Sequence, residues 1–283
     1  MALNTDHQKA ILVTGASSGI GLAACELMTQ KGFQVFGGVK PGSEEQPLRD
    51  AGAIPLALDV TSMSSLACAL ETLEARVGDG ALWGLVNSAG VVAAGPVELH
   101  DMGEARNVFE VNVMGVLATV QTFLPLIRRA GGRIVNLSSL SGLLAVPFLG
   151  PYCASKAAIE SLSDSMRREL RPLGVDVVAI QPGATRTRMW SKAEEIDLAP
   201  FDGTPYGPAT AKVKNRAVGK GHRGQSPQKV AEAIHLALTS KSPPTRIRVQ
   251  RKRLSRLLYS LLPLLADSVV DRKITDAVWS DLK

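Results

Sequence analysis

A phenol and an ammonium group stand four residues apart at Tyr152 and Lys156. On a helix this spacing places both side chains on one face, and Pro151 suits the first turn of such a helix. A tyrosine with an ordinary pKa of about 10 is a weak base near neutrality, but a close cation favours the phenolate. The pair can therefore serve as an acid/base centre. Taken alone, such a pair is more often a surface contact, so the interpretation depends on the surrounding elements.

A glycine-rich stretch runs from Thr14 to Gly21 and contains Gly15 and Gly19. An apolar run of strand type precedes it, and a stretch with helical spacing begins within it. Glycines in this context let the backbone turn tightly and approach a diphosphate, while the helix N-terminus offers N–H groups to the anion. The context predicts nucleotide binding, although the three residues between Gly15 and Gly19 differ from the usual dinucleotide spacing.

Short apolar runs alternate with longer stretches of helical spacing along most of the chain. The predicted strands are 10–14, 33–39, 54–58, 82–87, 133–138, 175–181 and 245–250, and the predicted helices are 20–31, 64–77, 104–129, 152–171 and 227–240. Such an alternation indicates an α/β fold in one domain, with a doubly wound, Rossmann-type parallel sheet covered by helices on both faces. Residues 188–225 interrupt the pattern and are expected to form a substrate loop or lid, and 251–283 a helical C-terminal extension.

The chain of 283 residues carries 32 basic and 26 acidic side chains, and this charge is unevenly placed. Residues 1–200 have 16 basic and 20 acidic side chains, whereas 201–283 have 16 and 6. Three cysteines, Cys25, Cys68 and Cys153, favour a reducing compartment with free thiols. The polar N-terminus predicts no signal peptide, and the apolar run 257–266 is too short to span a bilayer. These features together predict a cytoplasmic protein.

With these residues in view, the sequence resembles the classical short-chain dehydrogenase/reductase family, with a preference for its hydroxysteroid/retinol dehydrogenase-like branch. The family's motifs occur in order along residues 10–190, with Ser88 at a position where the family commonly has Asn. They are Thr14 to Gly21, Asp59-Val60, Asn87-Ser88-Ala89-Gly90, Asn112, Ser139, Tyr152, Lys156, Pro182-Gly183 and Thr187.

The resemblance implies hydride exchange between a nicotinamide cofactor and a carbonyl or secondary alcohol. It implies that Tyr152 handles the proton, Lys156 lowers the phenol pKa and holds the ribose, and Ser139 polarises the substrate oxygen. Asn112 would hold a water that links Lys156 to solvent. No metal is required. The implied cofactor-binding residues are Gly15, Ser17, Ser18, Gly19, Ile20, Gly21, Lys40, Asp59, Val60, Asn87, Ala89, Gly90, Tyr152, Lys156, Pro182, Gly183, Thr185 and Thr187.

The end of the second predicted strand bears on the choice between NAD and NADP. In these folds an acidic residue there takes the ribose 2′-hydroxyl, and a basic residue accommodates a 2′-phosphate. Here Val39 occupies the expected acidic position and Lys40 follows. Together with Ser18 as a phosphate donor, this favours NADP (NADPH). If Lys40 is merely a solvated loop residue, the site accepts NAD as well.

The expected substrate pocket lies at the carboxyl ends of the strands and has mainly apolar walls, which suit a lipophilic steroid, retinoid or other ketone or aldehyde. Core packing is the competing explanation for each wall residue. The substrate-binding candidates are Ser139, Leu144, Phe148, Tyr152, Met189 and Trp190, with Leu143, Val146, Phe201 and Tyr206 as further walls. The other functions considered are a 3-oxoacyl-type reductase and a non-catalytic nucleotide-sensing or scaffold protein.

The C-terminal region combines a basic cluster with a helix that has one apolar face. The cluster is Arg246, Arg248, Arg251, Lys252, Arg253 and Arg256, and the apolar face is Leu257, Leu258, Leu261, Leu262 and Leu265. Packing on the protein body or a partner subunit is the preferred interpretation, and peripheral contact with an anionic membrane is the alternative. Nucleic-acid binding lacks a supporting motif. By resemblance, a homodimer or homotetramer is expected.

Overall fold

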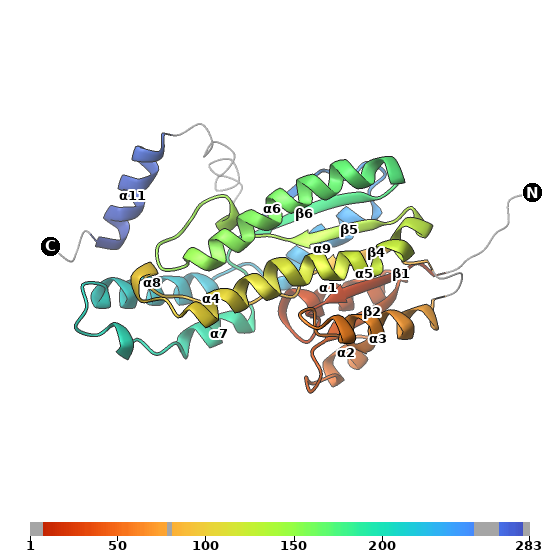
Figure 1. The fold of residues 1–283 in the computed structure, drawn as a ribbon, viewed down its shortest axis with the longest axis horizontal. Helices are drawn as coiled ribbons and strands as arrows, with labels where there is room; N and C mark the ends of the chain where they lie inside the picture. Colours follow the sequence, from red (N-terminus) through yellow and green to blue (C-terminus); the bar gives the residue numbers. More distant parts are fainter. Residues whose placement is uncertain (1–7, 78–80, 252–265, 280–283) are drawn as a thin grey trace, which may run out of the picture.

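The computed structural model describes residues 8–77, 81–251 and 266–279. A central sheet of seven strands runs in the order β3-β2-β1-β4-β5-β6-β7, and every pairing between neighbours is parallel (Figure 1). The order reverses at β1, where a doubly wound sheet opens its binding crevice. The strands are β1 Ala10–Thr14, β2 Gln34–Val39, β3 Ile54–Ala57, β4 Gly84–Asn87, β5 Arg133–Leu137, β6 Asp176–Pro182 and β7 Arg246–Val249. This confirms the α/β fold class and the parallel sheet that the sequence predicts.

Helices cover both faces of the sheet, because right-handed crossovers between parallel strands place them there. They are α1 Gly19–Gln30, α2 Gln46–Asp50, α3 Met63–Glu74, α4 Met102–Phe109, α5 Gly115–Ala130, α6 Gly150–Leu170, α7 Arg188–Glu194, α8 Gly207–His222, α9 Pro227–Thr239 and α11 Asp267–Trp279. Short turns of 3-10 helix occur as well, among them η2 at Val97–Leu99.

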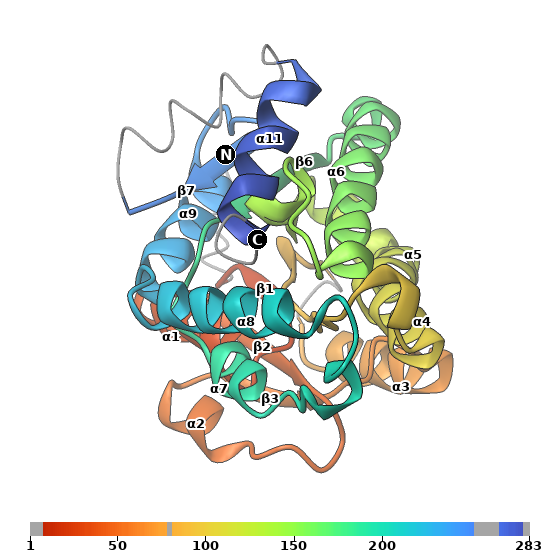
Figure 2. The same cartoon turned by 90° about the vertical axis from the view of Figure 1, so that its left-hand side faces the viewer.

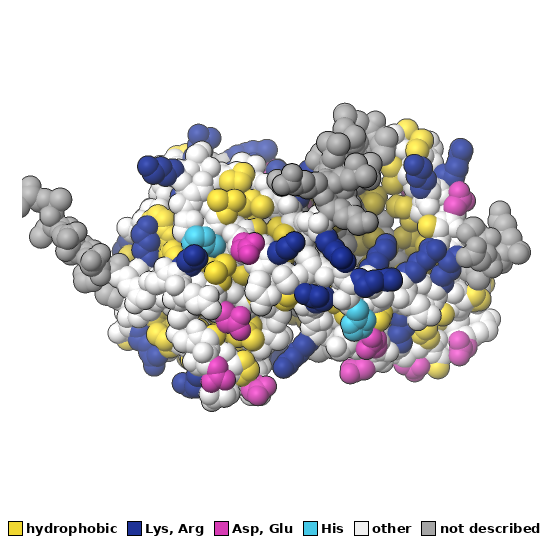
Figure 3. All heavy atoms as spheres, turned by 180° about the vertical axis from the view of Figure 1, so that it is seen from behind, with side chains coloured by type: hydrophobic (Ala, Val, Ile, Leu, Met, Phe, Trp, Pro, Cys, Tyr) yellow, Lys and Arg dark blue, Asp and Glu magenta, His cyan; other side chains and the backbone are white. Residues whose placement is uncertain are grey.

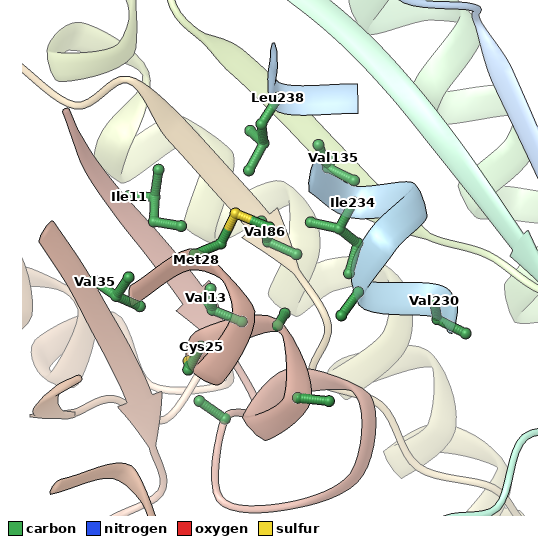
Figure 4. Packing of buried hydrophobic residues seen from close by; sticks show 14 of the residues in the cluster. Ile11, Val13, Cys25, Met28, Val35, Val86, Val135, Val230, Ile234 and Leu238 are labelled. Atoms are coloured by element: carbon green, nitrogen blue, oxygen red, sulfur yellow. The ribbon is translucent and has the colours of Figure 1, made fainter. Parts of the chain in front are cut away.

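Two apolar clusters, one on each face, hold the helices to the sheet. On one face, α1 and α9 pack against the strands through side chains such as Met28 and Ile234, as Figure 4 shows. On the other face, α3, α5 and α6 pack through side chains such as Leu66, Phe123 and Ile159. Burial of side chains of this size contributes roughly 1.5–3 kcal/mol each. The sheet is therefore a rigid support for the loops at its carboxyl edge.

The segment Met102–Ala130 is, among the residues described, the one helical run long and apolar enough to cross a bilayer by length and composition. Its apolar side chains are engaged within the fold, because Val120, Phe123 and Ile127 belong to the buried cluster between α5 and the sheet. A core helix of this kind passes the same test as a membrane span.

The structure differs from the sequence prediction in several helices, among them the short α2, which was not predicted. The predicted helix 104–129 is divided into α4 and α5 by one π-helical turn, Glu110–Met114. The irregular segment 188–225 holds the helices α7 and α8, which the sequence did not predict. Gly219, Gly221 and the scattered lysines of α8 obscure its apolar periodicity, so tertiary packing decides its helical state. The predicted apolar tail face at 257–265 lies outside the described residues.

The elements that belong to neither face gather at the carboxyl end of the strands. Figure 2 views the molecule from that end, with α7, α8 and α11 in front of the sheet. Contacts join α7 to α8 and α8 to α11, so these three helices form one layer over the strand ends. The loops that carry the predicted site residues leave the sheet beneath this layer.

Candidate active site

The glycine loop between β1 and α1 adopts a conformation that requires glycine. Gly15 and Gly19 have φ of 64° and 60°, a region that disfavours side chains. A Cβ on Gly15 would lie 2.6 Å from the Cα of Ala89, and one on Gly21 would collide with the carbonyl oxygen of Gly15. The loop therefore lies directly against the turn after β4, and its backbone stays open to a ligand.

Thr14 holds that neighbouring turn in place. Its hydroxyl accepts hydrogen bonds from the backbone N–H groups of Ser88, at 3.1 Å, and Ala89, at 3.2 Å. Both bonds involve backbone donors, so the turn does not depend on the side chain at position 88. This explains why Ser88 can replace the family's usual Asn without changing the turn.

The N-terminus of α1 offers an anion site beside the loop. Ser18 is its N-cap residue, and its side chain makes no capping hydrogen bond, so the N–H groups of the first turn are not engaged by the cap. Thr187 approaches from the other side, since a Cβ on Gly19 would lie 3.2 Å from its Cγ2 atom. Loop, helix terminus and Thr187 thus form a cradle that fits the diphosphate of a dinucleotide. Ser17 and Ile20 lie in the same loop and first turn.

A second group of polar side chains lies at the ends of β5 and α6. Ser139, just after β5, faces Tyr152 in the first turn of α6, and its side chain lowers the pKa of the Tyr152 phenol as a hydrogen-bond partner. Lys156, one turn later, is buried, and its Nζ lies 5.9 Å from the centre of the Tyr152 ring. The structure thus brings together Tyr152 and Lys156, the predicted acid/base pair, and Ser139, to which the resemblance assigns the substrate oxygen.

The electrostatics of this group differ from the sequence prediction. Burial raises the pKa of Tyr152 above its ordinary value, and the hydrogen bond with Ser139 only partly offsets this. Burial lowers the pKa of Lys156 to about 8. In the protein alone, Lys156 directs its Nζ to the backbone carbonyl of Leu137, at 2.9 Å. In the protein without its cofactor these effects favour the neutral phenol of Tyr152, whereas the sequence predicted a phenolate favoured by the lysine.

Asn112 lies in the π-helical turn between α4 and α5 and is completely buried. Its Oδ1 accepts from the Val91 N–H at 2.8 Å, and its Nδ2 donates to the Val91 carbonyl and to the Ser155 hydroxyl. The position that a Cβ on Gly90 would take lies 3.3 Å from this Oδ1 and 3.6 Å from the Nζ of Lys156. Gly90 thus keeps the space between the amide and the ammonium free of a side chain.

Asn87 is part of a buried polar chain that the sequence did not reveal. Its Nδ2 donates to Oδ1 of Asn136 at 2.8 Å, and Asn136 Nδ2 donates to the Ser163 hydroxyl at 2.9 Å. This chain ties β4 and β5 to α6, the helix that carries Tyr152. In the sequence, the only sign of this chain is that Asn87, Asn136 and Ser163 are polar residues within apolar strands and a helix. The pairing of β4 with β5 in the structure shows that Asn87 and Asn136 meet.

The adenosine side of the predicted site contains Lys40 and Asp59. Lys40, directly after β2, is exposed, and its Nζ lies 3.2 Å from Oδ2 of Asp59. Hydrogen bonds from Thr61, and then Lys40, lower the pKa of Asp59 despite partial burial. Val39 points into the core, and Val60 packs against Gly115. The end of β2 therefore carries a cation and no carboxylate of its own.

Hydrogen bonds to β7 and to Gln225, which precedes α9, fix the turn after β6. Gly183 N–H donates to the Val249 carbonyl at 2.9 Å, and the Thr185 hydroxyl donates to the Gly183 carbonyl. Gln225 donates to both the Thr185 hydroxyl and the Val249 carbonyl. This network positions Pro182, Gly183 and Thr187 over the carboxyl edge of the sheet.

The candidate substrate walls fall into two groups. Leu144 and Phe148 lie in the loop that joins β5 to α6, where the Leu144 N–H donates to the Leu140 carbonyl and the Phe148 carbonyl accepts from the Gly95 N–H. Met189 and Trp190 lie in α7, and the Trp190 ring packs against Gly221 while its Nε1 donates to the Thr185 carbonyl. Trp190 also lines a pocket of about 390 Å³ with Ser18, Gly19 and Leu22, so its described contacts are on the glycine-loop side.

Basic side chains lie on the surface beside the glycine loop. Arg186 and Arg188 are exposed and line the same pocket beside the glycine loop. Figure 3 shows Lys and Arg side chains gathered across the middle of the face opposite to that of Figure 1. A positive surface near the glycine loop favours an anionic cofactor.

The parallel sheet, the glycine loop beside the N-terminus of α1, and the group formed by Ser139, Tyr152 and Lys156 define a nucleotide-binding α/β protein. Residues 9–197 match the short chain dehydrogenase family, and the chain belongs to that family in its classical form. It is 34% identical to an NADPH-dependent 3-dehydrocapnine reductase of Ornithobacterium rhinotracheale, over 96% of each chain. It is 31% identical to mouse retinol dehydrogenase 16, over 98% of this chain and 90% of the relative.

Two further similarities agree with this assignment. Human 17-beta-hydroxysteroid dehydrogenase type 6 is 36% identical over 68% of this chain and 61% of its own length. A short chain dehydrogenase/reductase of Burkholderia phymatum, solved in complex with NAD, has a TM-score of 0.76 and 26% identity, over 91% of this chain and 95% of that one. The protein is thus an oxidoreductase of the hydroxysteroid/retinol dehydrogenase-like branch that uses a nicotinamide cofactor and small-molecule substrates.

Proposed function

We propose that this protein interconverts a ketone or aldehyde carbonyl and the corresponding alcohol on a lipophilic small molecule, with NADP(H) as the preferred cofactor and Tyr152 as the acid/base. The gathering of Ser139, Tyr152 and the buried Lys156, whose Nζ lies 5.9 Å from the centre of the Tyr152 ring, is the observation that carries this proposal. A nicotinamide cofactor supplies hydride in the reducing direction and accepts it in the oxidising direction. The glycine loop and the N-terminus of α1 would hold its diphosphate.

The protein's own residues would handle the proton. In the reducing direction Tyr152 donates its hydroxyl proton to the substrate oxygen as negative charge develops there, and Ser139 donates a hydrogen bond to the same oxygen. The raised pKa of Tyr152 keeps the proton on the phenol until it is needed. Because the pKa of Lys156 is lowered to about 8, this lysine exchanges protons close to neutral pH and can return a proton to the phenolate.

Asn112 is proposed to position this proton supply. Its side chain is held by Val91 and Ser155, and the position that a Cβ on Gly90 would take lies 3.3 Å from its Oδ1 and 3.6 Å from the Lys156 Nζ, so this space adjoins both groups. A water at that point would connect Lys156 toward solvent. The π-helical turn aims the amide inward, as expected where a helix is distorted at a functional site.

The preference for NADP rests on the end of β2. Val39 places no carboxylate there to repel a 2′-phosphate, and Lys40 supplies an exposed cation. The relative whose printed name states NADPH dependence matches nearly the whole chain. Asp59 counteracts this preference, because its carboxylate already pairs with Lys40, so the proposed preference is moderate rather than absolute.

The test is a spectrophotometric screen for consumption of NADPH and NADH across steroids, all-trans-retinal, a 3-oxoacyl thioester, and 2-alkanones of increasing chain length. Turnover of steroid, retinoid or long alkanone substrates with NADPH is expected, with a lower KM for NADPH than for NADH. Cofactor binding without turnover of any substrate would instead indicate a nucleotide-sensing protein. Turnover of the 3-oxoacyl thioester alone would indicate an acyl reductase.

A further inference from the structure

Ser155 precedes Lys156 on α6, and its hydroxyl joins the π-helical turn to the backbone of Tyr152. The side chain is completely buried. Its hydroxyl donates to the Tyr152 carbonyl at 2.7 Å, and its Oγ accepts from Nδ2 of Asn112 at 3.0 Å. A serine on a helix commonly bonds to a carbonyl of the preceding turn, but this one also receives the amide that the proposed proton supply uses. Ser155 therefore links two residues of the proposed site.

The donors and acceptors in this group fix which way the Asn112 amide points. A hydroxyl has one proton, and the Ser155 proton is committed to the Tyr152 carbonyl, which can only accept. The Ser155 oxygen therefore offers a lone pair to Asn112, and the amide turns its Nδ2 toward it. The second hydrogen of Nδ2 goes to the Val91 carbonyl, while the Val91 N–H donates to Oδ1. All these bonds require the same orientation of the amide.

This orientation decides what the amide presents to Lys156. The Oδ1 atom of Asn112 accepts one hydrogen bond, from Val91, and keeps a second lone pair. The same oxygen adjoins the space beside Gly90, which also adjoins the Lys156 Nζ. A water in that space would accept from the ammonium and donate to Oδ1, whereas an amide turned the other way would set an N–H donor against the cation. The Ser155 hydroxyl thus keeps an acceptor on the side of the lysine.

A purely structural role is the competing explanation, and Ser163, two turns later on α6, shows what such a role looks like. Ser163 is also buried, donates to a carbonyl of the preceding turn at 2.6 Å, and accepts from Nδ2 of Asn136 at 2.9 Å. The two serines therefore make the same pair of hydrogen bonds. The asparagine bonded to Ser155 adjoins the Lys156 ammonium, whereas the asparagine bonded to Ser163 accepts from Asn87. Ser163 is thus a matched control on the same helix.

We propose that Ser155 is a positioning residue for the reaction: its hydroxyl orients the Asn112 amide so that an oxygen acceptor faces the space through which Lys156 regains its proton. This inference rests on the proposed function, because it concerns the proton supply of the same site. Loss of the hydroxyl leaves one hydrogen of the buried amide without a partner, so the amide no longer has a single favoured orientation. Ser155 thus acts on the return of the proton and leaves the binding of cofactor and substrate unchanged.

The test uses Ser155→Ala and the best substrate that the wild-type protein reduces in the screen described above. The kcat for reduction at pH 7 is expected to fall about tenfold, while KM and the Kd of NADPH stay within about twofold of wild type. Imidazole, added at constant pH and ionic strength, should raise the kcat of this variant at least about threefold, because a small proton donor replaces the missing supply. The kcat of the wild-type protein and of Ser163→Ala should not respond to imidazole.

A double variant shows whether Ser155 acts through Asn112. Residues that act as one unit have effects that do not add, so Ser155→Ala with Asn112→Ala should be no slower than Asn112→Ala alone. Circular dichroism reports the fold, and Ser155→Cys, with a poorer acceptor of similar size, carries the same comparison if the alanine variant is misfolded.

Three results would overturn the inference alone: an unchanged kcat, a loss that imidazole does not restore, or losses that multiply in the double variant. Absence of turnover by the wild-type protein would overturn the proposed function and the inference with it.

Discussion

The Nζ atom of Lys156 donates a hydrogen bond of 2.9 Å to the backbone carbonyl of Leu137, the last residue of β5. The ammonium is thereby fixed at the carboxyl edge of the sheet, one helical turn after Tyr152. It is also largely removed from water, since the residue is only 6% exposed. Desolvation disfavours the charged form of a lysine, which is why its pKa falls to about 8. A lysine of this kind changes charge close to physiological pH.

Reduction should therefore slow as pH rises. Above about pH 8 the Lys156 ammonium loses its proton and no longer resupplies Tyr152, so kcat/KM for carbonyl reduction should fall about tenfold per pH unit. The alcohol oxidation rate should rise over the same range. Initial rates from pH 6 to 10 in both directions provide the measurement. A reductive profile that stays flat to pH 10 would contradict this role for Lys156.

The same lysine should make stability depend on pH. Its pKa is lower in the folded protein than its ordinary 10.5, so the unfolded chain binds more protons between about pH 8 and 10.5, and folding gains stability as pH rises through that window. The penalty below pH 8 is on the order of 3 kcal/mol. Lys156→Met should lack this rise. Urea unfolding at pH 7 and pH 10 measures it, and equal pH dependence in both proteins would show that Lys156 is not the source.

Lys40 should govern the choice of cofactor. Lys40→Ala is expected to raise the KM for NADPH about fivefold or more and leave the KM for NADH nearly unchanged, because only NADP carries the 2′-phosphate. Asp59→Asn should lower the KM for NADPH, since it releases Lys40 from its 3.2 Å ion pair. Lys241→Ala, another exposed lysine, is the control. If the KM values for NADPH and NADH rise equally in Lys40→Ala, then Lys40 does not set the preference for NADPH.

Phe148 should show the cost of its backbone conformation. Phe148→Ala and Phe148→Gly both remove the ring, but only glycine adopts a φ of 66° without strain from a Cβ. The glycine variant should therefore be the more stable of the two by about 1 kcal/mol. Equilibrium unfolding in urea gives the difference directly. An alanine variant as stable as the glycine variant would mean that the loop relaxes when the ring is lost.

Much of the fold could be predicted because strand and glycine-loop signals are local. The run at 10–14 is apolar up to its last residue, Thr14, and β1 occupies those residues in the structure. Tyr152 and Lys156 share a face of α6 because four residues make about one helical turn. Their proximity to Ser139 follows from β5 and α6 being consecutive elements.

Other features depend on contacts that no local pattern contains. The helix α8 is held by packing, with Gly221 giving room for the Trp190 ring, and its own glycines and lysines argue against a helix. The meeting of Phe148 with Trp279 joins residues far apart in the chain. The raised pKa of Tyr152 depends on burial, which spacing alone does not report. The sequence therefore indicated Tyr152 and Lys156 as candidates for proton transfer, but it indicated neither the burial that shifts their pKa values nor the aromatic contacts of Phe148.

The most direct measurement of the central claim is turnover by Tyr152→Phe alongside its binding of NADPH. Removing the hydroxyl takes away the proton donor while leaving the ring, the glycine loop and the N-terminus of α1 in place. Carbonyl reduction should fall at least about a hundredfold, and the Kd of NADPH should stay within about twofold of wild type. Retained turnover, within a few-fold of the wild-type rate, would contradict the role of Tyr152 as the acid/base.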